Sequence, residues 1–274
     1  MRDEVRTTDN ERSGRYYDPD AEHAFPDERV NDVLDYVTDD EEIVAYLEAQ
    51  NANPVDRLGY NDHGTKHIEI VWNRALCLYD LLKSGGVEFN GATQQGLDEA
   101  DEPVIIALAA LLHDIGHVAH RDDHAYYSIP LASDVLDRIL PEFYGIAESV
   151  RVKGEVLHAI VCHHSTEDPL TMEAGVVRVS DALDMERGRS RVPYESGGRG
   201  INTVSSQAIE QVALEADVDK PVLVEIEMTN AAGVYQVDHL LKRKIESSGL
   251  KEHLRIVAVN THSGDDTIVE RIEL

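Results

Sequence analysis

The stretch PVIIALAALLHDIGH, from Pro103 to His117, decides the fold of this chain. Residues 104–112 are uniformly apolar and predict a buried helix. That helix runs straight into His113, Asp114 and His117, and buried apolar helices rarely end in three ionisable groups for packing reasons. Adjacent His113 and Asp114 cannot share one helix face, so both can face a common site only at an irregular turn, which Gly116 supplies. The stretch therefore predicts a helical core with a functional site at the end of its central helix.

Helical patterns flank this stretch on both sides. An amphipathic pattern occupies about 63–82 and ends at Gly85 and Gly86. Before it, 26–50 holds two short helical patterns, and Thr38 is the expected N-cap of the second. Further helices are predicted near 126–140, 143–163 and 172–186, with one more after Thr203. These patterns predict a mainly α fold.

The character of the sequence changes after Arg187, where a stretch rich in Gly, Arg and Ser begins. Apolar, strand-like runs follow at 222–228, 254–259 and 267–274, with a helix at about 235–247. The predicted organisation is a polar N-terminus expected to be disordered at 1–25, a helical domain that carries the functional site at 26–190, and an Arg/Gly loop with a small α+β domain at 191–274.

The charge of the chain is extreme, with 53 acidic and 25 basic residues and a formal net charge of -28. Such a surface repels itself in dilute buffer but stays hydrated in molar salt, where the Debye length shrinks to about 3 Å. We interpret the acidity as an adaptation to the salty cytoplasm of a halophilic archaeon, with a generic acidic protein as the alternative. Nucleic-acid backbones should be repelled, which argues against nucleic acid as a partner.

Cysteine usage and hydropathy indicate the compartment. Cys77 and Cys162 both lie inside apolar helical patterns, so they are expected to be small buried hydrophobes and not a disulfide pair. No apolar run approaches the roughly 18 to 20 residues of a membrane span, and the N-terminus has no signal-peptide pattern. We expect a cytoplasmic protein with no membrane partner.

The imidazoles and carboxylates of the helical region form a candidate metal site. His67 lies on the first long helix, His113 and Asp114 end the buried helix, and Asp181 lies on a later one. Divalent metals are held by such groups when they converge from several elements. The order of His67, then His113-Asp114, then Asp181 resembles the H…HD…D signature of the HD superfamily of metal-dependent phosphohydrolases, over about half the chain. The resemblance implies an HD-type helical bundle in which these four residues bind one metal.

Additional histidines suggest a second metal. In two-metal members of that superfamily the HD aspartate bridges the ions, and later histidines complete the second site. The segment from His124 to Ser128 and the pair His163-His164 resemble those elements. The two histidines of the pair point in different directions on a helix, so one alone could ligate. One metal with several supporting histidines is the alternative, and the sequence does not distinguish among Mn, Fe, Ni, Co, Mg and Zn.

Three histidines are candidates for catalysis. His63 lies one helical turn before His67, which is similar to a pattern in cyclic-nucleotide phosphodiesterases of the wider superfamily, where the first histidine protonates the leaving oxygen. A histidine suits general acid work because its ordinary pKa is near 6.5. A capping or ligand-supporting role for His63 is the alternative, and His117 and His120 are then the next candidates.

Basic residues are few enough in this acidic chain, 25 against 53 acidic ones, for a local cluster to be informative. Four arginines follow the candidate ligand Asp181 in a Gly/Ser-rich stretch, and one adjoins His120; guanidinium forks match phosphate oxygens. The predicted phosphate-binding residues are Arg121, Arg187, Arg189, Arg191 and Arg199. Salt bridges within the protein are the alternative role.

The expected reaction is hydrolysis of a phosphoester or phosphoanhydride by metal-activated hydroxide, with a small phosphorylated substrate that the resemblance suggests is a nucleotide. Two other functions remain open: a non-catalytic metal- or nucleotide-binding sensor of the same fold, and an oxygenase that uses two irons on the same ligands. The C-terminal domain could form a homodimer, bind a regulator or cover the site.

Overall fold

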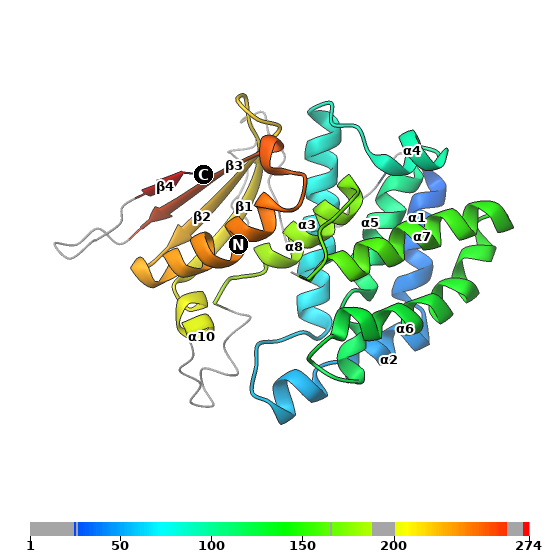
Figure 1. The fold of residues 1–274 in the computed structure, drawn as a ribbon, viewed down its shortest axis with the longest axis horizontal. Helices are drawn as coiled ribbons and strands as arrows, with labels where there is room; N and C mark the ends of the chain where they lie inside the picture. Colours follow the sequence, from blue (N-terminus) through cyan, green and yellow to red (C-terminus); the bar gives the residue numbers. More distant parts are fainter. Residues whose placement is uncertain (1–24, 26, 165, 188–200, 262–270, 274) are drawn as a thin grey trace, which may run out of the picture.

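The computed structural model describes residues 25, 27–164, 166–187, 201–261 and 271–273. Figure 1 shows a helical bundle with a small sheet beside it, which confirms the predicted mainly α fold with a C-terminal α+β part. Within the described residues, no helix combines the length and the apolar character that crossing a membrane requires. Cys77 and Cys162 are both buried free thiols, as expected.

The helical part is built around α5, Asp101–Leu112, which is buried along its whole length. A helix that is apolar all round must be enclosed by others, and α5 packs against α3, α7, α8 and α1. The α-helices of this part are α1 Glu28–Thr38, α2 Glu41–Ala49, α3 Thr65–Ser84, α4 Asn90–Gln95, α5, α6 His124–Ile139, α7 Ile146–Cys162 and α8 Met172–Leu183. Short turns complete it: the π-helix η1 Ala52–Arg57 and the 3-10 helices η2 Ile115–Val118 and η3 Leu140–Glu142.

The C-terminal part is a four-stranded mixed sheet in the order β1-β2-β3-β4. Its strands are β1 Ile209–Ala216, β2 Val222–Met228, β3 Leu254–Asn260 and β4 Arg271–Glu273. The short helix α10, Ile201–Ser206, precedes β1, and β2 and β3 are joined through η4 Ala231–Gly233, the π-helix η5 Gln236–Leu241, α11 Lys242–Glu246 and η6 Lys251–His253. Strands β2 and β3 run parallel, and the outer pairs are antiparallel.

The sheet and the bundle share one apolar core. Alternate residues of β2 are buried, from Val222 to Met228, and they belong to the same hydrophobic cluster as the residues of α5. The sheet contacts α3, and η5 and α11 contact α8. The C-terminal part is therefore packed directly against two of the helices that carry candidate ligands.

One local expectation was wrong, and strand β1 was not predicted. Thr38 does not cap the second helix: its hydroxyl donates to the Leu34 carbonyl inside α1, and Asp40 caps α2 by accepting from two backbone N–H groups. The helix expected after Thr203 ends at Ser206, and β1 follows it, because residues 211–216 pair with β2.

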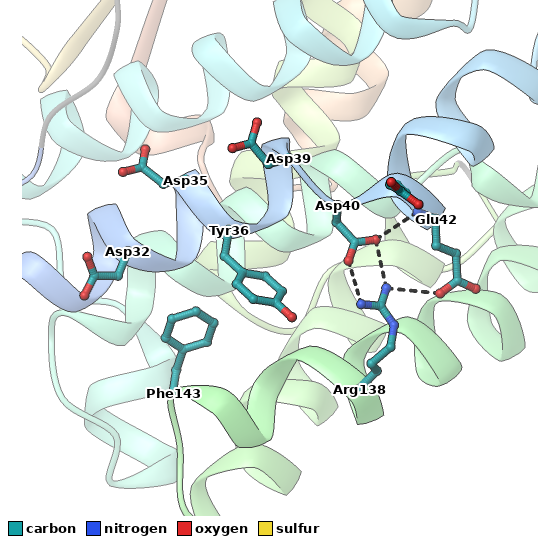
Figure 2. A pocket seen from close by; sticks show the side chains of 9 residues that line it. Asp32, Asp35, Tyr36, Asp39, Asp40, Glu42, Arg138 and Phe143 are labelled. Carbon is teal, nitrogen blue, oxygen red and sulfur yellow. Dashed lines mark hydrogen bonds and ion pairs between the residues drawn. The ribbon is translucent and has the colours of Figure 1, made fainter.

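A surface groove of about 1040 Å³ lies between α1, α2 and the end of α6. Figure 2 shows its lining, in which acidic side chains surround Tyr36 and Phe143. Arg138 binds Asp40 through two hydrogen bonds of 2.5 and 2.8 Å and Glu42 through a third of 3.0 Å. The groove contains none of the predicted metal ligands.

Candidate metal centre

The predicted ligands meet around Asp114, whose side chain is almost completely buried. His113 is the C-cap of α5, and Asp114, directly after it, is the N-cap of the 3-10 turn η2. The change from α-helical to 3-10 geometry turns two neighbouring side chains toward one point: His113 Nε2 lies 3.5 Å from Asp114 Oδ2. His117, in the same turn, places its Nε2 3.6 Å from Asp114 Oδ1.

One oxygen of Asp114 faces a first group of candidate ligands. His67 Nε2 lies 3.4 Å from Asp114 Oδ2 and 3.6 Å from Asp181 Oδ1. His113 Nε2 lies 4.0 Å from the same Asp181 oxygen. Ligands bound to one ion at about 2.1 Å stand roughly 3 to 3.5 Å apart. His67, His113 and Asp114 therefore have the spacing of a shared cation site, with Asp181 beside them.

The other oxygen of Asp114 faces a second group. His124 Nε2 lies 3.2 Å from Asp114 Oδ1, and His163 Nε2 lies 3.6 Å from it. The two Nε2 atoms are 3.0 Å apart, with His117 stacked on His124 at a centroid separation of 4.1 Å. Asp114 thus belongs to both groups, one on each carboxylate oxygen, which is the arrangement that two neighbouring cations require.

The far ring nitrogens of these histidines are held by other groups. The Nδ1 of His113, His124 and His163 lies 2.6 to 2.8 Å from the carbonyl oxygens of Ala110, Arg121 and Ile160, so each can donate to that oxygen and turn Nε2 to the centre. His67 Nδ1 instead lies 2.6 Å from Asp184 Oδ2. Such outer partners fix the tautomer and orientation of a metal-binding histidine.

Asp184 was not identified from the sequence. It lies three residues after Asp181, at the C-cap of α8, and is buried. Arg74 of α3 is also buried and donates to the Leu183 carbonyl and to Glu186. A second acidic residue one helical turn after a candidate ligand is a signal that could have indicated this support for His67.

Burial keeps most of the cluster in the protonation state that binds metal. It lowers the pKa of His113, of His117 to about 2 and of His163 to about 3. Burial also opposes charge on His124, but the hydrogen bond and charge of Asp114 outweigh it and raise the pKa of that imidazole. For Asp114 burial again opposes the charge, yet the surrounding histidines hold the carboxyl pKa well below its usual range.

The cluster also leaves polar atoms that a cation would satisfy. In the described part of the chain, His113 Nε2 and both ring nitrogens of His117 are buried without a hydrogen-bond partner. A buried polar atom with no partner costs about 1 to 3 kcal/mol. The donor set of imidazoles and carboxylates suits a divalent transition metal, so the residues fit the cofactor that the sequence predicts.

The other predicted histidines are placed differently. His63, which precedes α3, brings Nδ1 to 2.7 Å from Asp114 Oδ2 and packs its ring on His117. His164 is exposed, with its ring 5.3 Å from that of His124. His120 is also exposed and accepts a hydrogen bond from the Asp122 backbone through Nδ1. His63 joins the centre, His164 borders it, and His120 stands outside it.

The described arginines of the predicted phosphate clamp are engaged elsewhere. Arg121 lies over the ring of Tyr60 at 3.9 Å and pairs with Asp122 at 3.4 Å. Arg187 is exposed and lies 3.9 Å from Glu210. The remaining three predictions, Arg189, Arg191 and Arg199, lie outside the described residues. The clamp therefore stays a prediction.

Comparisons with known proteins agree with this geometry. Residues 71–186 match the HD domain family. An uncharacterized protein of Methanocaldococcus jannaschii, MJ1020, is 37% identical over 226 residues, which cover 82% of this chain and 87% of that protein. Ribonuclease Y of Desulforudis audaxviator is 26% identical over 147 residues, which cover 51% of this chain and 26% of that protein. Ribonuclease Y of Desulforamulus reducens is 35% identical over 89 residues, which cover 32% of this chain and 15% of that protein. No solved structure matches the chain.

Proposed function

The chain belongs to the HD domain family, and from that premise we propose that it is a metal-dependent phosphohydrolase that cleaves phosphoester or phosphoanhydride bonds in small phosphorylated molecules, with nucleotides as the favoured substrates. The observation that supports this most directly is the position of Asp114 between two groups of imidazoles, one on each carboxylate oxygen. Divalent cations held there would acidify a water molecule and offset the charge of a phosphate.

The protein's own residues prepare this chemistry. Neutral imidazoles face the site because burial disfavours their protonation. His67 is held by Asp184, so its Nε2 stays aimed at the centre. His63 stands at the edge of the cluster, with its side chain 14% exposed, where it could pass a proton to a leaving oxygen.

The charge of the chain and its relatives support the proposed size and type of substrate. Ribonuclease Y, by its name, cleaves RNA, and its similarity to this chain supports phosphodiester chemistry in the shared region. A net charge of -28 argues against a long polyanion as the substrate, because repulsion grows with the number of phosphates. We therefore favour nucleotides or short phosphodiesters over RNA.

The test begins with the metal content of the purified protein and continues with a phosphate-release screen over nucleotides and nitrophenyl phosphoesters in molar KCl. Asp114→Asn should lose both metal and hydrolysis, because it removes charge from the carboxylate that both ligand groups share. Asp122→Asn is the matched control, since that carboxylate is largely exposed and stands outside the cluster. Metal-loaded protein that hydrolyses none of these compounds would contradict the proposed function.

A further inference from the structure

A lysine from the C-terminal part of the chain reaches the metal centre. Lys244 lies on α11, the short helix that follows η5 (orange in Figure 1) and contacts α8. Its Nζ is 2.5 Å from Asp181 Oδ2. Asp181 therefore presents one oxygen to His67 and the other to the ammonium of Lys244, which lies 63 residues away in sequence.

Packing does not require a charge at this position. Leu241 and Ile245, on either side of Lys244, are buried and already anchor the segment in the apolar core. The Lys244 side chain is 21% exposed, so its ammonium lies at the border between the cluster and solvent.

Lys244 differs from the other cations near the centre in having donors to spare. An ammonium has three donors, and Asp181 is its one hydrogen-bond partner among the described residues. Arg178 of α8 is buried and donates to the carbonyls of Cys162, His164 and Glu167. Arg121, as described above, is stacked on Tyr60 and paired with Asp122.

The positive charge of Lys244 is informative because it opposes the binding of a metal ion at the neighbouring site. A positive group beside a divalent site repels the cation, and the repulsion is strong where burial lowers the effective dielectric constant. An anionic ligand that touches both the cation and the ammonium removes that penalty. A lysine is a common phosphate ligand in proteins and acts there as a point charge.

We propose that Lys244 is a substrate-binding residue whose ammonium contacts a phosphate oxygen, so that the C-terminal α+β part completes the active site. This inference rests on the proposed function, because it assigns a phosphate as the ligand of that site. The role is one of binding and orientation, and no proton transfer is assigned to Lys244.

The experiment compares Lys244→Gln, Lys244→Arg and Lys242→Gln in the Mn²⁺-loaded full chain. Lys242 is the matched control because it lies on the same helix and pairs with Asp238 at the surface. Binding of inorganic phosphate is measured by calorimetry, together with metal content, melting temperature and the hydrolysis kinetics of p-nitrophenyl phosphate. Loss of one charge-assisted hydrogen bond should weaken phosphate binding by about 10- to 100-fold in Lys244→Gln.

Metal content and melting temperature of Lys244→Gln should stay close to those of Lys242→Gln. In Lys244→Gln, KM should rise more than kcat falls. Lys244→Arg should recover most of the phosphate affinity. Equal phosphate affinity in Lys244→Gln and the unaltered protein would overturn the inference, as would metal-loaded unaltered protein that binds no phosphate. Loss of metal or of stability in both Lys244 variants would also overturn it, in favour of a purely structural ion pair. If phosphate binds and depends on Lys244 while no phosphoester is cleaved, the hydrolase proposal fails, and what stands is the contact between Lys244 and a bound phosphate.

Discussion

At the scale of single residues, Asp114 organises the centre because its two oxygens serve different partners. Oδ2 faces His67, His113 and His63, and Oδ1 faces His117, His124 and His163. The position of Asp114 at the start of a 3-10 turn, with both oxygens enclosed, lets one residue join two binding groups.

His63 tests whether the cluster includes a proton donor. Its contact with Asp114 holds the ring at the edge of the site, so His63→Ala should retain the metal while hydrolysis of a substrate with a poor leaving group falls by about 10² to 10⁴. A nitrophenyl phosphoester needs little protonation and should lose far less. His239→Ala, an exposed histidine of η5, is the control. Equal losses on both substrates, with metal affinity 10- to 100-fold weaker, would instead show that His63 supports a ligand.

The lowered histidine pKa values predict how the metal-free protein responds to acid. Below the ordinary pKa near 6.5, the unfolded chain takes up protons on histidines that the folded protein keeps neutral, so stability falls as pH falls. His113, His117 and His163 act in this sense, with burial as the main cause. The raised pKa of His124 acts in the opposite sense, but the three lowered values outnumber it, so the net effect is a loss of stability as pH falls.

For the EDTA-treated protein, the free energy of unfolding should fall by about 1.4 kcal/mol per pH unit for each histidine by which those with a lowered pKa outnumber the one with a raised pKa. The measurement is urea unfolding between pH 7.5 and 5 in constant salt. The lowered pKa of Asp114 should extend the loss below about pH 4. A free energy of unfolding that stays constant from pH 7.5 to 5 would contradict the buried, neutral state of these imidazoles.

At the scale of elements, the junction between α5, η2 and α6 shapes the site. Gly116 was expected to supply an irregular turn, and it does lie in the 3-10 turn η2. Its φ is not positive, so the turn itself does not require a glycine; the close approach of α6 does. A Cβ at this position would lie 2.0 Å from the His124 carbonyl oxygen and 2.5 Å from the Ser128 nitrogen. Ser128 also accepts from Gly116 N and donates to the His113 carbonyl, each at 2.8 Å. The glycine therefore allows α6 to approach the turn closely enough to place His124.

Gly116→Ala should consequently destabilise the protein by about 3 kcal/mol or more, since rigid backbone must move to admit the methyl group. Metal should be lost along with stability. Gly154→Ala is the matched control, because a Cβ at this position in the middle of α7 would meet no heavy atom within 4 Å beyond the nearby backbone of its own helix. That change should stabilise the protein by about 0.5 to 1 kcal/mol. Chemical unfolding and metal analysis of both variants test the pair, and equal stabilities would refute the close approach.

At the scale of the whole molecule, the excess of negative charge shapes stability. The groove of Figure 2 is a local example of this crowding of negative charge, because Asp32, Asp35 and Asp39 are exposed on or beside one helix, α1. Arg138 pairs with Asp40 and Glu42 in the same groove but cannot offset the rest. Like charges at such spacing destabilise a helix, and their repulsion is long-ranged in dilute buffer.

The melting temperature should therefore rise between low salt and molar KCl, because salt screens the repulsion that a net charge of -28 produces. The measurement is a thermal scan of the metal-free protein, so that salt does not act through the metal. Sodium and potassium chloride should give similar results if screening is the cause. A melting temperature that is constant or falls with salt would contradict the halophilic interpretation.

The sequence by itself determined the parts of this protein that local patterns specify. The uniform apolar run of α5 can be stable only when enclosed, and the adjacent His113 and Asp114 at its end mark the site. The order of His67, Asp114 and Asp181 along the chain indicated the family before any geometry was known. The C-terminal strands β2 and β3 were also predictable, because their apolar runs are rich in β-branched residues.

Tertiary structure decided everything that depends on contacts between distant residues. Strand β1, with the sequence IEQVALEA, contains several good helix formers and becomes a strand because it pairs with β2. Asp184 meets His67 across 117 positions, and Lys244 meets Asp181 across 63. The spacing of Asp181 and Asp184 could have marked Asp184 as a candidate, but both pairs form only when α3, α8 and the C-terminal part pack on a common core. The division of Asp114 between two ligand groups has the same origin, because it depends on which helices supply the imidazoles on each side.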